Sequence, residues 1–118
     1  MAKKSKAKQD ELIAQEINRW NGIFKDISHD KKDAAARIIE KVAFMTTTLE
    51  ILEEDIKTKG PTYKFENGSQ VMIIENPSQK SYNTMINRYT AACDKLFNLL
   101  PKEVADDEKN KRSKNDLI

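Results

Sequence analysis

Between positions 31 and 58 the apolar residues recur at alternating intervals of three and four, the pattern of one long helix. Seven positions keep this alternation without a break: Ala35, Ile38, Val42, Met45, Leu49, Leu52 and Ile56. Such spacing places all seven side chains on one helix face and is typical of packing against neighbouring helices. A helix over 31–58 is roughly 40 Å long at 1.5 Å per residue. That length is unusual in a chain of 118 residues, and the pattern predicts a mainly helical, elongated fold.

Two further segments have the same periodicity. The first runs over about 10–27 and presents an apolar stripe on one side: Ile13, Ile17, Trp20, Phe24 and Ile27. The other begins at Asn76-Pro77, where Asn is a favourable N-cap and Pro suits the first helical position. Its stripe ends at Leu99, and Leu100-Pro101 closes it. The chain is therefore expected to contain three amphipathic helices.

The segment 62–74 changes to strand chemistry. Asn67-Gly68 is a strong two-residue hairpin signal, because both residues tolerate positive φ. A turn centred there places Phe65 opposite Gln70. One face of the predicted hairpin is apolar through Tyr63, Phe65, Met72 and Ile74, and the other still carries Val71 and Ile73.

A hairpin with two apolar faces needs a covering surface. A two-stranded ribbon alone is marginally stable in water, and three helices of one small chain offer little surface to cover it. Contact between copies solves both problems, and heterologous contacts around an axis close into a ring. We therefore predict an oligomeric ring, with these oligomerisation residues in the hairpin: Tyr63, Phe65, Met72, Ile73 and Ile74.

Composition limits the protein class. The length fits one domain, and three Gly and three Pro are too few for a turn-rich β-sandwich. The single cysteine, Cys93, excludes an internal disulfide and a cysteine-rich metal site. The longest apolar run, 71–74, is too short to span a bilayer, and no apolar stretch follows the basic start, as a signal peptide requires. These features predict a soluble intracellular protein.

Positive charge gathers at two places. Residues 1–8 carry four lysines and no acid, and the third helix carries three cations against Asp94 alone. Basic side chains of this kind bind nucleic-acid phosphates and release counterions, whereas a short lysine-rich end can also serve only solubility. The candidate DNA-binding residues are Lys3, Lys4, Lys6, Lys8, Lys80, Arg88 and Lys95.

Taken along the chain, the pattern divides it into three parts. We expect a basic disordered arm at 1–9, a helical oligomerisation domain at 10–100 with its hairpin at 62–74, and a charged tail at 101–118.

No catalytic constellation is present in the sequence. No phosphate-binding loop is possible, because Gly60 is followed by Pro61 and not by a Gly-Lys-Ser/Thr run. The one histidine, His29, falls in a predicted turn, and Cys93 falls near an apolar stripe where a buried core role is expected. The acidic cluster around Glu50 has no accompanying histidine or ligand spacing, which favours a solvated or inter-subunit surface over a magnesium site. We therefore predict no enzymatic activity, no metal and no cofactor.

The stretch from Ala34 to Pro101 resembles the small subunit of a tailed-bacteriophage terminase. The family pattern is a basic start, helices, a short polar hairpin around Gly, an Asn-Pro opening of an amphipathic helix and a Leu-Pro-like stop. The matching pieces here are 51–60, Glu66-Asn67-Gly68-Ser69, Glu75-Asn76-Pro77-Ser78 and 96–101.

The resemblance implies a role in viral genome packaging in the cytoplasm of a bacterial host. Such a subunit binds double-stranded phage DNA, delivers it to the large terminase subunit and regulates the ATPase and nuclease of that subunit. It also implies a ring-like homo-oligomer of roughly eight to eleven copies, closed by rotation. Two alternatives remain open from the residues alone: a non-enzymatic helical adaptor of the coiled-coil type, and a small dimeric DNA-binding regulator.

Overall fold

The computed structural model describes residues 4–100 and is mainly helical, with one two-stranded antiparallel sheet. The hairpin lies between the second and third helices, as the sequence predicted. The elements in chain order are α1 (Lys6–Ile23), α2 (His29–Lys59), β1 (Thr62–Asn67), β2 (Gln70–Glu75) and α3 (Pro77–Leu99).

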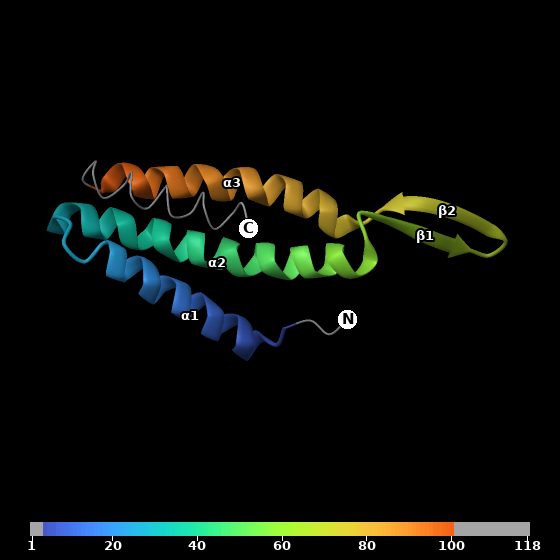
Figure 1. The fold of residues 1–118 in the computed structure, drawn as a ribbon, viewed down its shortest axis with the longest axis horizontal. Helices are drawn as coiled ribbons and strands as arrows, with labels where there is room; N and C mark the ends of the chain where they lie inside the picture. The colour runs from blue at the N-terminus through green and yellow to red at the C-terminus, as the bar shows by residue number, and fades with distance from the viewer. Residues whose placement is uncertain (1–3, 101–118) are drawn as a thin grey trace.

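The molecule is elongated, with extents of 63 × 29 × 23 Å. Helices α2 and α3 run side by side in opposite directions, and the hairpin extends from the end where they are joined (Figure 1). Helix α1 packs against the first part of α2 and diverges from it toward the N-terminus (Figure 1). The half of the molecule near the hairpin is therefore thinner than the other half.

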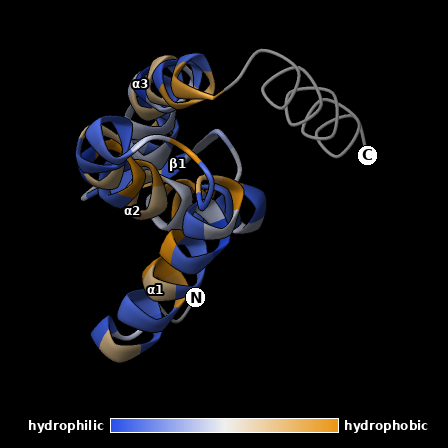
Figure 2. Cartoon of the chain, turned by 90° about the vertical axis from the view of Figure 1, so that its left-hand side faces the viewer, coloured by the Kyte–Doolittle hydropathy of each residue, from blue (hydrophilic) through white to orange (hydrophobic). Residues whose placement is uncertain are grey.

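The core lies where all three helices meet, far from the hairpin. Figure 2 looks onto this end, where apolar orange stretches of the helices lie among hydrophilic blue ones. The buried core residues are Trp20, Phe24, Ala35, Ile39, Val42, Cys93, Leu96, Phe97 and Leu100. Cys93 is thus a core residue, as expected. Ile39 is buried in preference to the predicted Ile38, because α2 is covered by helices on two sides and buries a wider arc than one stripe.

Helix α1 begins about one turn earlier than the periodicity predicted. The side chain of Ser5 is the N-cap and accepts a hydrogen bond from the backbone N–H of Lys8 at 3.1 Å. The expected disorder of 1–9 is therefore wrong for residues 6–9, which are helical. The helix also ends at Ile23 and not near residue 27. Apolar periodicity indicates only which face of a helix is buried. It does not indicate where a helix begins when its first turn is polar and capped by a side chain such as that of Ser5.

The hairpin register differs from the predicted one by two residues. Phe65 pairs with Met72, not with Gln70, because the central turn residues are Gly68 and Ser69. Among the described residues only glycines have positive φ, with Gly68 at 64°. A Gly at the first central position and a negative φ at the second are the features of a type II′ turn. A shift of two residues leaves each side chain on its predicted face.

Asn76 fixes the hairpin to the helices. Its side-chain oxygen accepts a hydrogen bond from Ser78 N–H at 2.9 Å, and its amide donates to the carbonyl of Gly60 at 3.0 Å. The backbone N–H of Asn76 also donates to the carbonyl of Pro61 at 2.8 Å. The N-cap and the proline at the helix start were predicted and are confirmed. The bond to Gly60, which connects the ends of α2 and α3, was not predicted.

Two side-chain hydrogen bonds extend this connection along the helices. Ser78 donates to the Asp55 carboxylate at 2.7 Å, and Tyr82 donates to Glu53 at 3.1 Å. The bond from Ser78 is the main cause that lowers the pKa of Asp55. Burial, followed by the charge of Glu53, raises the pKa of Tyr82. The first half of α3 is therefore held to α2 by polar contacts, whereas its second half packs in the core.

Replacing Thr47 by Val is expected to raise the free energy of unfolding by about 1 kcal/mol, since a buried hydroxyl without a partner costs stability. Thr47 is 2% exposed, and its Oγ1 has no hydrogen-bond partner among the described residues. The matched control is Thr46→Val, which removes a 2.9 Å bond from Thr46 Oγ1 to the carbonyl of Val42. Urea denaturation measures both. Equal destabilisation by the two substitutions would contradict this account.

Candidate nucleic-acid and assembly surfaces

The N-terminal lysines have acidic partners close by. Lys6 Nζ lies 2.7 Å from the carboxylate of Asp10, and Lys8 Nζ lies 3.6 Å from that of Glu11. The hydrogen bond and the charge of Asp10 raise the pKa of Lys6, so its ammonium stays charged. Both lysines lie in the first turn of α1. They present less net positive charge than the isolated basic arm expected from the sequence.

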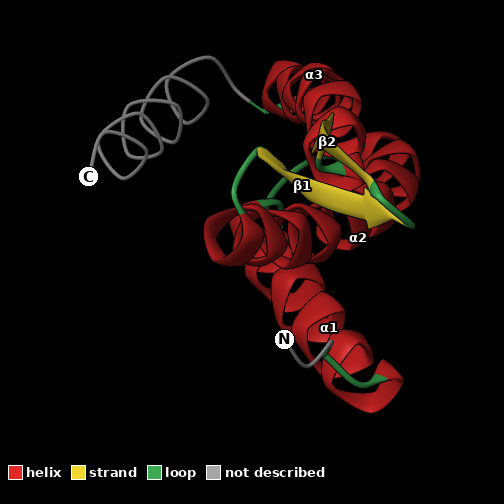
Figure 3. Cartoon of the chain, turned by 90° about the vertical axis from the view of Figure 1, so that its right-hand side faces the viewer, coloured by secondary structure: helices red, strands yellow, loops and turns green. Residues whose placement is uncertain are grey.

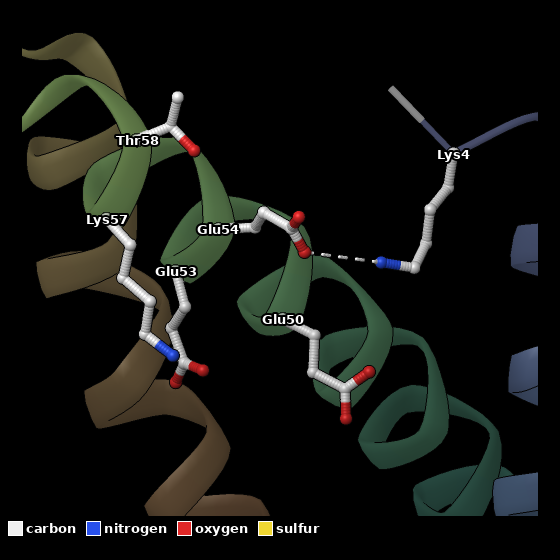
Figure 4. Close-up of a pocket in the computed structure, with 6 residues that line it drawn as sticks. All are labelled: Lys4, Glu50, Glu53, Glu54, Lys57 and Thr58. Atoms are coloured by element: carbon white, nitrogen blue, oxygen red, sulfur yellow. Dashed lines mark ion pairs between the residues drawn. The ribbon is translucent and has the colours of Figure 1, made fainter. Parts of the chain in front are cut away.

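The other two lysines of this segment are placed differently. Lys4 precedes α1 and is half-buried, with its Nζ 4.0 Å from a carboxylate oxygen of Glu54. This contact holds the start of the chain against α2 (Figure 4). Lys3 lies outside the described residues, as does the expected tail at 101–118.

Three cations of α3 share one exposed face. Successive helical residues are about 100° apart around the axis, which places Lys80, Arg88 and Lys95 within an arc of about 80°. All three are exposed, and none forms an ion pair within residues 4–100. Thr84 lies between Lys80 and Arg88 and lines a shallow hollow with them. This basic face is the most available cationic surface that the sequence predicted.

The basic face is also long. At 1.5 Å per residue, Lys80 and Arg88 are about 12 Å apart along the axis, and Lys95 lies about 10 Å further. A line of cations of this length matches an extended polyanion better than a single phosphate group. Phosphate contacts of this kind position a protein on DNA without reading the bases.

The hairpin carries four of the most exposed large apolar side chains in the described chain. The exposed fractions are 46% for Phe65, 59% for Val71, 51% for Met72 and 73% for Ile73. The predicted residues Tyr63 and Ile74 are half-buried nearer the helices. Figure 3, viewed from the hairpin end, shows both strands standing in front of the helices. The five predicted oligomerisation residues therefore lie together on one projecting element.

An acidic groove runs beside the half of α2 nearest the hairpin. It has a volume of about 510 Å³ and is lined by Lys4, Glu50, Glu53, Glu54, Lys57 and Thr58 (Figure 4). Burial, and then the charge of Glu16, raise the pKa of Glu50. Within the described chain, no group of three or more His, Cys, Asp or Glu side chains is placed to hold a metal ion. Two lysines line the groove with the carboxylates, which suits a mixed charged surface.

His29 and Cys93 differ in their exposure to solvent. His29 is the exposed first residue of α2, and Ser28 precedes it as N-cap without a side-chain bond. Cys93 is in the core.

The sequence reasoning missed Asn76 as a tertiary anchor and Ser5 as a helix start. Only the capping preference of these residue types signalled them. None of the helices in the described residues is both long enough and apolar enough to cross a bilayer. No protein-family model, curated protein or solved structure matches this chain.

Proposed function

We propose that the chain is the small subunit of a tailed-bacteriophage terminase. In this proposal it is a non-enzymatic homo-oligomer that binds double-stranded phage DNA during genome packaging. It delivers the DNA to the large terminase subunit and regulates the ATPase and nuclease of that subunit. Two of the four stretches that support the resemblance are Glu66-Asn67-Gly68-Ser69 and Glu75-Asn76-Pro77-Ser78. The first forms the hairpin turn, and the second joins the hairpin to α3.

The observation that carries the proposal is the basic face of α3. Lys80, Arg88 and Lys95 are exposed and have no acidic partner within residues 4–100. Free cations release the counterions of DNA more effectively than cations already paired with carboxylates. Lys6 and Lys8 add a secondary contribution, because Asp10 and Glu11 offset part of their charge.

Oligomerisation makes this weak surface effective. Three phosphate contacts per copy are few, but copies linked in one assembly act on the same duplex at high effective concentration. The exposed apolar hairpin supports self-association, since isolated patches of this kind mark interaction sites. We propose a ring of roughly eight to eleven copies, closed by heterologous contacts.

A helical adaptor without a DNA role is the second candidate. The ion pairs of Lys6 and Lys8 favour it, because they use positive charge that a DNA-binding arm would leave free. The adaptor has no reason to bind DNA in a salt-dependent way, whereas the terminase subunit does.

The test is a DNA titration at several salt concentrations with Lys80, Arg88 and Lys95 all changed to Gln. Since log K falls with log salt at about 0.9 per neutralised phosphate, we expect the slope to become shallower by about 2.7 for each copy in contact. The matched control changes Lys25, Lys31 and Lys32 to Gln, which removes the same charge from other exposed positions. The same loss in both variants, or none in either, contradicts the proposal.

A further inference from the structure

The hairpin has two open edges whose composition differs. In an antiparallel ladder, hydrogen-bonded pairs alternate with pairs whose N–H and C=O groups point outward. The bond from Asn76 N–H to the Pro61 carbonyl, at 2.8 Å, continues the ladder past the base of the hairpin and fixes which pairs are bonded. The outward-pointing residues are therefore Thr62, Lys64 and Glu66 on β1, and Val71, Ile73 and Glu75 on β2.

The edge of β2 has no protection against pairing. Proteins usually guard open edges with charged residues, prolines or bulges. Over 70–74 the strand β2 carries no charge and no proline, and its outward residues Val71 and Ile73 are 59% and 73% exposed. Its first charged residue is Glu75, at the base. The edge of β1, by contrast, carries two outward charges, Lys64 and Glu66, and Lys64 is the one whose sign is opposite to that of Glu75.

We propose that the edge of β2 pairs antiparallel with the edge of β1 on a second copy of this chain. Lys64 of one copy then lies opposite Glu75 of the next, and Phe65 lies opposite Ile74. The inference rests on the oligomer proposed above and specifies its contact. Opposite charges and aromatic–branched pairs are favourable when directly across two strands. Each copy uses both edges, which leaves no free edge in a closed assembly.

Charge complementarity and closure select the same register. Within one hairpin Lys64 lies opposite Ile73 and Thr62 lies opposite Glu75. Repeating that register between copies would place both charges of the β1 edge against apolar residues, Lys64 against Ile73 and Glu66 against Val71, and would give no stagger. The proposed register leaves only Glu66 opposite an apolar residue, Ile73. In the proposed register each copy is displaced by two residues along the strand direction relative to the copy before it. Because each copy contributes two strands, the total stagger equals the number of strands. Closed sheets require such a stagger, and a stagger equal to the strand number corresponds to a strand tilt of about 36°.

The first test exchanges the two charges between copies. Lys64→Glu and Glu75→Lys each place like charges across the proposed contact, so each variant alone is expected to assemble at concentrations at least about tenfold higher than the unaltered chain. An equal mixture restores opposite charges at every contact, provided that the copies alternate. We expect the mixture to assemble as the unaltered chain does, with an even number of copies by native mass spectrometry.

Rescue by mixing cannot arise within one copy, because mixing leaves each hairpin unchanged. Assembly of either variant alone at the unaltered concentration overturns the proposal, and so does a mixture that behaves like its components. If the unaltered chain itself is monomeric, the oligomer proposed above fails as well. If it forms an oligomer that neither substitution affects, only the edge contact fails.

The second test removes a single outward N–H from each edge. Ile73→Pro and Lys64→Pro delete donors that make no bond within the hairpin, a position where strands tolerate proline. Both are expected to reduce assembly at least tenfold more than Ile73→Ala, which keeps the backbone donor. Loss with Ile73→Pro but not with Lys64→Pro would indicate a symmetric contact between two β2 strands and overturn the proposal. Equal effects of Ile73→Pro and Ile73→Ala would assign the contact to side chains and also overturn it.

Discussion

Replacing Trp20 by Ala is expected to lower the free energy of unfolding by about 3–5 kcal/mol. Trp20 is fully buried, and its ring centroid lies 6.2 Å from that of Phe24 and 5.8 Å from that of Phe97. It is the largest side chain of the core and joins α1 to the last turns of α3. Small domains are stable by only about 5–15 kcal/mol, so this single change removes a large part of the total.

The measurement is urea denaturation followed by far-UV circular dichroism. The matched control is Phe44→Ala, which also truncates an aromatic side chain but at a position on α2 that is 53% exposed. Because Ala has the higher helix propensity, we expect this control to change stability by less than about 0.5 kcal/mol. A loss from Phe44→Ala as large as that from Trp20→Ala would mean that the three-helix junction is not the main core.

The elements that the sequence predicted well are those with strong local signals. The alternation from Ala35 to Ile56 determined α2 to within two residues at its start, and Asn76-Pro77 marked the beginning of α3. The two apolar faces of the hairpin were also correct despite the wrong register, because a shift of two residues preserves side-chain direction. Local chemistry thus indicated the three-helix architecture and its projecting strands.

The parts that the sequence did not predict depend on contacts between distant residues. Asn76 bonds to Gly60, sixteen residues earlier, and no local pattern indicates that pair. The pairing of Lys4 with Glu54 likewise depends on how the chain before α1 returns to α2. The sequence therefore suggests that the N-terminal lysines are free positive charges, whereas in the structure Lys4, Lys6 and Lys8 each lie within 4.0 Å of a carboxylate.

The basic face of α3 was recognisable for a different reason. Asp94 is the only acidic residue in α3. The three cations of this helix therefore have few carboxylates within the helix with which to form ion pairs. The opposite face of α3 is buried, because Leu96 and Phe97 pack in the core. The cations are therefore exposed to solvent. Helical geometry then fixes the remaining cations on the outside.

Changing Phe65 and Ile73 together to Asp is expected to reduce the native mass from that of the proposed oligomer to that of one 13.6 kDa chain. Both side chains are already well exposed, at 46% and 73%, so the double substitution leaves the core unchanged. Phe65 and Ile73 lie on opposite faces of the hairpin. If a second copy covered either face, the new carboxylate on that face would lose its hydration. Burial of an unpaired charge is costly enough to prevent association.

Light scattering at micromolar concentration gives the mass, and circular dichroism gives the helix content, which we expect to remain at the level of the unaltered chain. The matched control introduces two Asp residues on exposed positions of α2, as Ala36→Asp with Phe44→Asp. It makes the same change in net charge and removes one exposed aromatic side chain, but it leaves the hairpin intact. The control should therefore keep the full native mass. If the hairpin variant also keeps it, the projecting strands contact something other than a second copy, and the assembly must be sought along the half-buried stripe of α2.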